Sequence, residues 1–152
     1  MHSYGATVRW ESGGADVGAG RYSRAHTWNF DGGLTVAASA SPTIVPAPWS
    51  DATAVDPEEA FVASVASCHM LWFLDIARTA GFMADTYSDT ARGQMTRNPD
   101  GDLWISRIDL CPEATWTGTT PGRNTLRDLH NNAHERCFIA NSVRSEIILH
   151  IP

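Results

Sequence analysis

Apolar and polar side chains alternate along the first third of the chain. Asp31-Gly-Gly, inside this region, is a tight-turn sequence that suits a hairpin. The alternating stretches are rich in aromatic and β-branched residues, as strands are, and they cover residues 4–10, 21–30 and 34–39. We therefore predict a small antiparallel meander of three strands.

A long apolar stretch follows a proline-rich loop. Asp56 is a favourable N-cap, Pro57 suits the first helical position, and Glu58 favours the positive end of a helix dipole. Gly81 is a stop signal, so we predict a helix over residues 57–79. Because nearly every face of this helix is apolar, we expect a central element that is covered on both sides.

The second half of the chain predicts further strands and a second helix. Asn98-Pro-Asp-Gly-Asp is a strong turn signal between two strand-like stretches. The expected strands cover residues 86–97, 103–117 and 143–151, and the second helix runs from after Pro121 to Cys137. The order βββ-α-ββ-α-β predicts an α+β fold in which antiparallel sheets pack on two main helices. We expect one domain, residues 1–152.

Composition narrows the classes of function. Charged residues make up 18% and the net charge is −6, so the sequence carries no electrostatic signature of nucleic-acid binding. All 11 basic residues are arginine, which leaves only arginine to contact an anion or a thiolate. The 3 cysteines do not suit a secreted disulfide scaffold, and the N-terminus lacks the features of a signal peptide. The 15-residue apolar segment 60–74 is shorter than the roughly 20 residues of a bilayer span, so we expect a cytoplasmic protein without a membrane partner.

Two cysteines are the leading candidates for chemistry. Cys68 lies about three turns into the first helix, where the helix dipole cannot help much, so a reactive thiolate there needs a cation from elsewhere. The N-terminal meander offers Arg21 and Arg24. Cys137, at the end of the second helix, is either a core residue or a resolving thiol. The simpler alternative for Cys68 is a small buried hydrophobe, and we interpret Cys111 as structural.

Glu58 constrains how a site around Cys68 could be built. It precedes Cys68 by ten residues, ~15 Å along one helix, so the two side chains cannot touch within that helix. Either a long arginine side chain bridges them, or the two groups of one site come from different subunits. The alternative is that Glu58 only stabilises the first helical turn.

The histidines allow a metal-binding alternative. His130, His134 and Cys137 recur at i, i+4 and i+7, on one face of the second helix, and Cys68-His69 lies on the first helix. Two cysteines and two histidines could bind zinc as a structural site. Against this alternative, the glutamate of the zinc-protease pattern is missing and adjacent ligands are uncommon. No phosphate-binding glycine loop, dinucleotide fingerprint or nucleophile elbow is present.

Two segments together resemble a known family. The stretch Pro57-Glu-Glu-Ala-Phe-Val-Ala-Ser-Val-Ala-Ser-Cys68 is similar to the Pro-Glu-(Glu/Gln)-x9-Cys segment of the OsmC/Ohr family, the osmotically inducible and organic hydroperoxide resistance proteins. The stretch Ala133-His-Glu-Arg-Cys137-Phe-Ile-Ala-Asn-Ser-Val resembles the second cysteine segment of that family. The predicted order of strands and helices agrees along essentially the whole chain.

The resemblance implies an OsmC-like fold, an intertwined homodimer with sites at its interface, and a cysteine-based peroxidase without metal or cofactor. It implies that Cys68 is the peroxidatic thiol and that Cys137 is the resolving thiol, with a dithiol or lipoyl-type reductant reopening their disulfide. It also implies that Glu58 pairs with a catalytic arginine, for which we choose Arg24, with Arg21 as the runner-up.

The neighbours of Cys68 bear on the substrate. Apolar walls would suit an organic hydroperoxide better than hydrogen peroxide, and the candidates for these walls are Phe61, Val65, Trp72 and Trp49. His69 and Met70 follow Cys68 where better-known members often carry phenylalanine. The alternative function on the same fold is a non-enzymatic protein that binds a small ligand.

Overall fold

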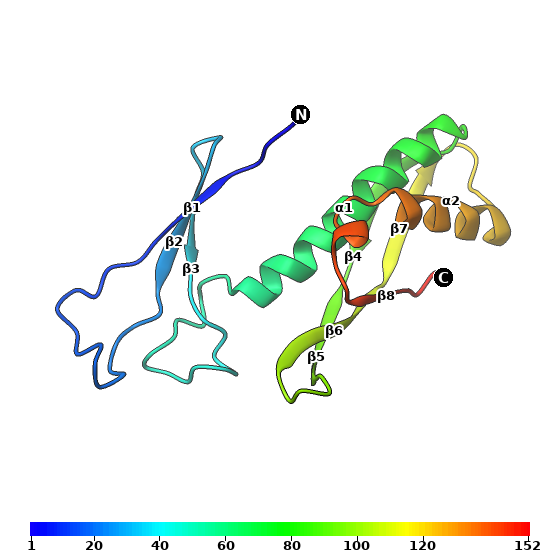
Figure 1. Cartoon of the computed structure of the whole chain (residues 1–152). Coiled ribbons are helices and arrows are strands. Elements are labelled where there is room, and N and C mark those ends of the chain that lie inside the picture. The colour runs from blue at the N-terminus through cyan, green and yellow to red at the C-terminus, as the bar shows by residue number, and fades with distance from the viewer. The chain divides into compact units, whose positions relative to one another are not determined.

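The computed structural model describes residues 1–152 and contains two compact units, Met1–Ala60 and Phe61–Pro152. Three strands precede the first long helix, and five strands and a second helix follow it. Figure 1 shows these elements coloured along the chain. The α+β class is confirmed, and the two main helices and the sheets are present. A single domain stays a prediction.

The first unit contains the predicted meander. Strands β1 (Ala6–Arg9), β2 (His26–Phe30) and β3 (Thr35–Ala38) form one antiparallel sheet in that order. The second strand begins five residues later than the alternation predicts. Residues 21–25 are irregular, so Arg24 precedes β2 and does not lie within it.

Helix α1 (Pro57–Thr79) has the predicted bounds. At its start Asp56 and Glu59 form a capping box: the Glu59 amide donates to Asp56 Oδ1 at 2.7 Å, and the Asp56 amide donates to Glu59 Oε2 at 3.3 Å. At its end Gly81 adopts φ 89°, and the next amide, of Phe82, donates to the Ala77 carbonyl at 2.9 Å. Local signals therefore set both ends of the helix.

The second unit holds two small sheets. Its elements are β4 (Met83–Asp89), β5 (Arg92–Arg97), β6 (Leu103–Leu110), β7 (Pro112–Thr117), α2 (Arg123–Arg136), the 3-10 turn η1 (Ala140–Ser142) and β8 (Glu146–Leu149). One sheet pairs β4 with β7 and the other has the order β5-β6-β8. All pairs are antiparallel except β6 with β8, which is parallel.

The prediction of two long strands in this unit was wrong. Each of them breaks in the middle, and its halves belong to different sheets. Pro112 follows the second break and lacks the amide hydrogen that a continuous ladder needs. The amide of Cys111 donates to Asp89 Oδ1 at 2.8 Å, so a side chain from the end of β4 satisfies the backbone at this break.

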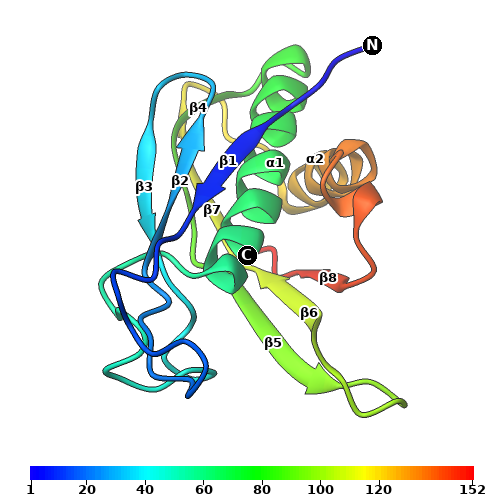
Figure 2. The ribbon, with the colours of Figure 1, turned by 60° about the vertical axis from the view of Figure 1, so that its left-hand side comes forward.

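The core of the second unit lies along one stripe of α1. Val65, His69, Phe73 and Ala77, spaced four residues apart, are buried. Phe73 and Ala77 pack with α2, and Val65 packs with β6. Figure 2 shows α1 and α2 crossing beside the two sheets of this unit. Leu71, off this stripe, is 62% exposed, so the expectation that the chain covers α1 on both sides was wrong for this face.

The length argument against a membrane span was also wrong. Helix α1 has 23 residues and an 18-residue window of mean hydropathy 1.6, which is long and apolar enough to cross a bilayer by length and composition alone. Of that window, 22% is buried inside the protein. The buried stripe, rather than the length, is what ties α1 to a protein core.

Gly93 provides a test of how α1 packs on β5. A Cβ at this position would lie 2.7 Å from Val62 Cγ2 and 3.4 Å from Ile105 Cγ2. Because valine is stiff about χ1, we expect Gly93→Ala to lower the free energy of unfolding by about 1–3 kcal/mol in urea denaturation. Gly5→Ala, where nothing lies within 4 Å, is the control. An equal effect of the two variants, or no relief in a Val62→Ala background, would contradict this packing.

Candidate thiol pair at the crossing of the two helices

The two candidate thiols lie at the crossing of α1 and α2. Cys68 is half-buried on α1, directly before the buried His69. Cys137 is the C-cap of α2 and is fully buried. Its amide donates to the His134 carbonyl at 3.2 Å, and its sulfur accepts a hydrogen bond from the Ala140 amide at 3.4 Å. The backbone after α2 therefore fixes the position of the Cys137 sulfur.

The structure brings Cys68 and Cys137 into contact. Burial, followed by a hydrogen bond with Cys68, raises the pKa of the Cys137 thiol to about 11. Both thiols are free, as is that of Cys111. Cys137 is therefore a protonated thiol at neutral pH. Cys111 lies between β6 and β7, at the strand break described above and not within a strand as predicted.

A buried histidine pair lies beside the thiols. His69 Nε2 and His130 Nδ1 are 3.0 Å apart, and the two rings stack with an interplanar angle of 4°. The other face of His130 stacks on Phe73, with centroids 4.0 Å apart. Desolvation lowers the pKa of His69 to about 3 and that of His130 to about 4, so both rings are neutral at pH 7.

Sequence reasoning placed both histidines near cysteines but missed this pair. The signal was available: His69 adjoins Cys68, and His130 lies on the α2 face that carries Cys137. What the sequence does not show is that the two rings meet. No group of three or more His, Cys, Asp or Glu side chains has the geometry to hold a metal ion, so the zinc alternative gains no support from this geometry.

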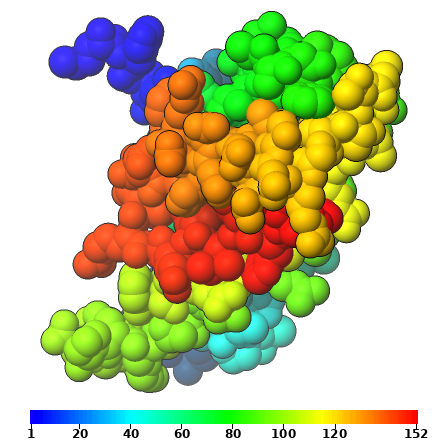
Figure 3. All heavy atoms as spheres, turned by 90° about the vertical axis from the view of Figure 1, so that its right-hand side faces the viewer, coloured from blue at the N-terminus to red at the C-terminus, as the bar shows by residue number.

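Apolar contacts surround the crossing. Trp72 packs edge to face with Phe138, with centroids 5.4 Å apart, and Arg136 lies over the Trp72 ring at 5.8 Å. Phe138, next to Cys137, is 68% exposed. Figure 3 shows the face on which α2 lies between the end of α1 and β8. Of the predicted apolar walls, Val65 is buried in the core, whereas Trp72 remains half-buried near Cys137.

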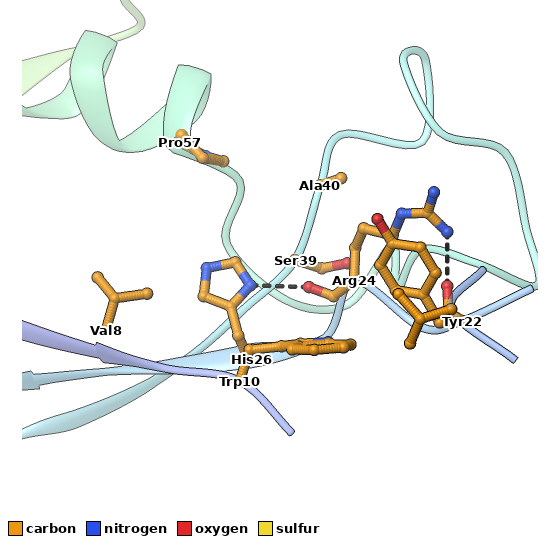
Figure 4. Close-up of a pocket in the computed structure, with 9 residues that line it drawn as sticks. Val8, Trp10, Tyr22, Arg24, His26, Ser39, Ala40 and Pro57 are labelled. Carbon is orange, nitrogen blue, oxygen red and sulfur yellow. Dashed lines mark hydrogen bonds between the residues drawn. The ribbon is translucent and has the colours of Figure 1, made fainter. Parts of the chain in front are cut away.

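The candidate arginines have different surroundings in the first unit. Arg21 forms an exposed ion pair with Asp16 at 2.5 Å. Arg24 instead lines an open pocket of about 490 Å³ (Figure 4). The other residues that line this pocket are Val8, Trp10, Val17, Tyr22, His26, Ser39, Ala40 and Pro57. Of the two arginines, only Arg24 therefore lines this pocket.

Glu58 makes no bond to Arg24 in this structure. The oxygen Oε2 of Glu58 is buried and has no hydrogen-bond partner. Arg24 Nη1 donates to the Tyr22 carbonyl at 2.6 Å and to the Gly20 carbonyl at 3.3 Å. The pairing of Glu58 with an arginine, like the roles of Cys68 and Cys137, stays a prediction.

Comparison with known protein families identifies the family of this chain. The family model described as OsmC-like protein matches residues 50–151. The chain belongs to the OsmC-like family. No curated protein sequence matches it. The matched region contains Glu58, Cys68 and Cys137, whereas Arg24 precedes it.

Solved structures share the fold of this OsmC-like chain over its full length. An OsmC-like protein of unknown function from Vibrio cholerae is 44% identical, with a TM-score of 0.97 and 100% of both chains covered. The organic hydroperoxide resistance protein OhrB of Bacillus subtilis is 20% identical, with a TM-score of 0.72, covering 99% of this chain and 98% of that one. An OsmC-like protein from Mycoplasma pneumoniae is 15% identical, with a TM-score of 0.74. The match covers 99% of this chain and 96% of that one.

The histidine pair predicts acid sensitivity of this OsmC-like fold. The folded-state pKa values of His69 and His130, about 3 and about 4, lie below the ordinary value of 6.5. Below pH 6.5 the unfolded chain therefore binds more protons than the folded one. We expect the free energy of unfolding to fall by up to about 1.4 kcal/mol per pH unit for each histidine as the pH drops from 6.5 toward 4.

Urea unfolding at pH 7.5 and at pH 5 measures this effect. His69→Leu/His130→Phe, which removes both titrating groups, should flatten the dependence, whereas His2→Gln at the exposed N-terminus should leave it unchanged. If the free energy of unfolding changed equally with pH in the wild-type protein and the double variant, His69 and His130 would not be the source of the acid sensitivity.

Proposed function

We propose that this protein is a thiol-dependent peroxidase that reduces organic hydroperoxides through a Cys68 sulfenic acid and a Cys68–Cys137 disulfide. The observation that carries the proposal is the contact between the half-buried Cys68 thiol and the buried, protonated Cys137 thiol. Solved relatives described as organic hydroperoxide resistance proteins, from Bacillus subtilis and Elizabethkingia anophelis, support the substrate class.

The two thiols have different tasks in the proposed reaction. A thiolate is the nucleophile in peroxide reduction, and a thiol whose pKa is about 11 stays protonated at neutral pH. Cys137 is therefore unsuited to attack the peroxide. Cys68, which is the more exposed of the two, attacks first, and Cys137 is held within reach of the product.

The reaction balances in three steps. Cys68 loses its proton to solvent, and the thiolate attacks the terminal oxygen of ROOH. The O–O bond breaks, Cys68 becomes a sulfenic acid, and the departing RO⁻ takes a proton from solvent to leave as ROH. Cys137 then attacks the sulfenic sulfur, its proton combines with the departing hydroxide as water, and the disulfide forms. A dithiol, such as a lipoyl-type reductant, opens the disulfide by exchange and is itself oxidised to a disulfide.

A cation is needed to stabilise the thiolate and the leaving alkoxide, and we assign this role to Arg24. Support comes from its place in an open pocket, in contrast to the ion-paired Arg21. The unpartnered carboxylate oxygen of Glu58 is a ready acceptor for a guanidinium. Glu58 and Cys68 are ~15 Å apart along α1, and of the two arrangements that this distance allows we choose the one in which the arginine–glutamate half of a site comes from one subunit and its thiol half from another.

The proposal therefore includes a homodimer with shared sites. We also propose a cytoplasmic location, where dithiol reductants are available.

The non-enzymatic alternative rests on one observation. The pocket of about 490 Å³ around Arg24 is of the size that small ligands occupy. A protein that binds an apolar ligand there without turning it over would share this fold. Peroxide consumption in the presence of a dithiol separates the two functions.

Single-cysteine variants test the division of tasks. We expect Cys68→Ser to lose turnover of cumene hydroperoxide with a dithiol reductant, because no nucleophile remains. Cys137→Ser should still form a sulfenic acid on Cys68, which dimedone traps, but should form no intramolecular disulfide. Cys111→Ser is the matched control and should keep wild-type turnover. Full peroxide turnover by Cys68→Ser would refute a peroxidase that acts through Cys68.

Mixed dimers test the shared site. Arg24→Ala should lower kcat/KM by about 100-fold to 1,000-fold, because the developing negative charge loses its partner, whereas Arg21→Ala should have little effect. We then co-express Arg24→Ala and Cys68→Ser chains with different affinity tags and purify the heterodimer. One of its two sites combines an intact Arg24 with an intact Cys68, so about half of the wild-type activity should return. No recovery in the isolated heterodimer would place both residues in one subunit and contradict the shared site.

A further inference from the structure

The imidazole ring of His26 is held by two hydrogen bonds at the edge of the Arg24 pocket. His26 and Trp28 lie two residues apart in β2, so their side chains share one face of the sheet. Trp28 Nε1 lies 3.0 Å from His26 Nε2, and His26 Nδ1 lies 2.7 Å from the Arg24 carbonyl oxygen. Figure 4 shows the ring directed at that carbonyl.

These two partners define the tautomer of His26. An indole N–H can only donate, so Nε2 of His26 must accept and carries no proton. A carbonyl oxygen can only accept, so Nδ1 carries the proton and donates it to Arg24. Trp28 therefore holds His26 in the neutral form whose proton faces Arg24.

The backbone of Arg24 depends on this bond because no sheet ladder supports it. Arg24 precedes β2, in the irregular segment that follows Arg21. Its amide donates to the Trp49 carbonyl at 2.8 Å, and its carbonyl accepts from His26 Nδ1. A side chain on one side and a loop carbonyl on the other thus replace the ladder bonds that a strand residue would make.

The guanidinium of Arg24 is directed by the same segment. It lies 3.7 Å above the centroid of the Tyr22 ring, and only Nη1 is engaged, by the Tyr22 and Gly20 carbonyls. Nε and Nη2 make no hydrogen bond in the structure, so they remain as donors for a ligand. A shift of the Arg24 backbone would move these donors together with the stack on Tyr22.

We propose that His26, fixed as its Nδ1–H tautomer by Trp28, is a positioning residue that sets the backbone of Arg24 and thereby aims its guanidinium. The inference rests on the proposed function for the role of Arg24 in peroxide reduction. His26 itself contacts neither the peroxide nor a thiol in the proposed reaction.

Two isosteric variants separate the two bonds of His26. Asparagine can place an N–H where Nδ1 lies, and glutamine can place an oxygen where Nε2 lies. We expect His26→Gln to lower kcat/KM for cumene hydroperoxide about tenfold, because the guanidinium is misplaced, and His26→Asn to retain most of the activity. In an Arg24→Ala background His26→Gln should cause no further loss. Equal losses in both backgrounds, or wild-type rates for His26→Gln, would overturn the inference.

Two measurements keep the inference testable without activity. In ¹⁵N-histidine NMR spectra, the His26 ring should show a protonated Nδ1 and an unprotonated Nε2, and Trp28→Phe should abolish this single form. Phenylglyoxal labelling of Arg24, mapped by peptide mass spectrometry, should be faster in His26→Gln than in His26→Asn. A protonated Nε2 in the wild type, or equal labelling, would overturn the inference. If the wild-type protein consumed no peroxide, the proposed function would be refuted. The NMR spectra and the labelling rates would still test whether His26 positions Arg24.

Discussion

The contact between α1 and α2 through His69 and His130 is the interaction on which the candidate site depends. It joins residues 61 positions apart, and Phe73 extends it as a second stacked ring. Because His69 adjoins Cys68, and His130 lies two turns before Cys137, the same crossing that buries the histidines brings the thiols together. Both rings must stay neutral in this position, which couples the geometry of the thiol pair to the pH at which the fold is stable.

A second constraint is the length of α1. One regular helix carries the capping box at Asp56 and Glu59, the unpartnered Glu58 carboxylate, and Cys68 about three turns further on. A rigid helix cannot fold back to bring Glu58 to Cys68. The proposed function therefore assigns Arg24 and Glu58 to one half of a site and the two thiols to the other half. In the proposed homodimer, each site takes one half from each subunit.

The elements that the sequence predicts well are those defined by local chemistry. The bounds of α1 follow from Asp56, Pro57 and Gly81, whose hydrogen bonds and φ angle are local. The strand breaks before β5 and β7 were missed because they depend on which sheet each half joins, and the Asp89–Cys111 bond that supports one break spans 22 positions. Of the candidate site, both cysteines were identified from their segments, whereas the histidine pairing and the support of Arg24 by His26 were not. These depend on ring orientations that periodicity does not encode.

In the proposed reaction, Cys68 and Cys137 form one redox couple that excludes Cys111. The most direct measurement is mass spectrometry of the wild-type protein after one equivalent of cumene hydroperoxide, with free thiols blocked before digestion. We expect a single new cross-linked peptide that joins Cys68 to Cys137, with Cys111 recovered in its blocked form. A disulfide that includes Cys111, or a chain whose three thiols all remain reduced, would contradict it.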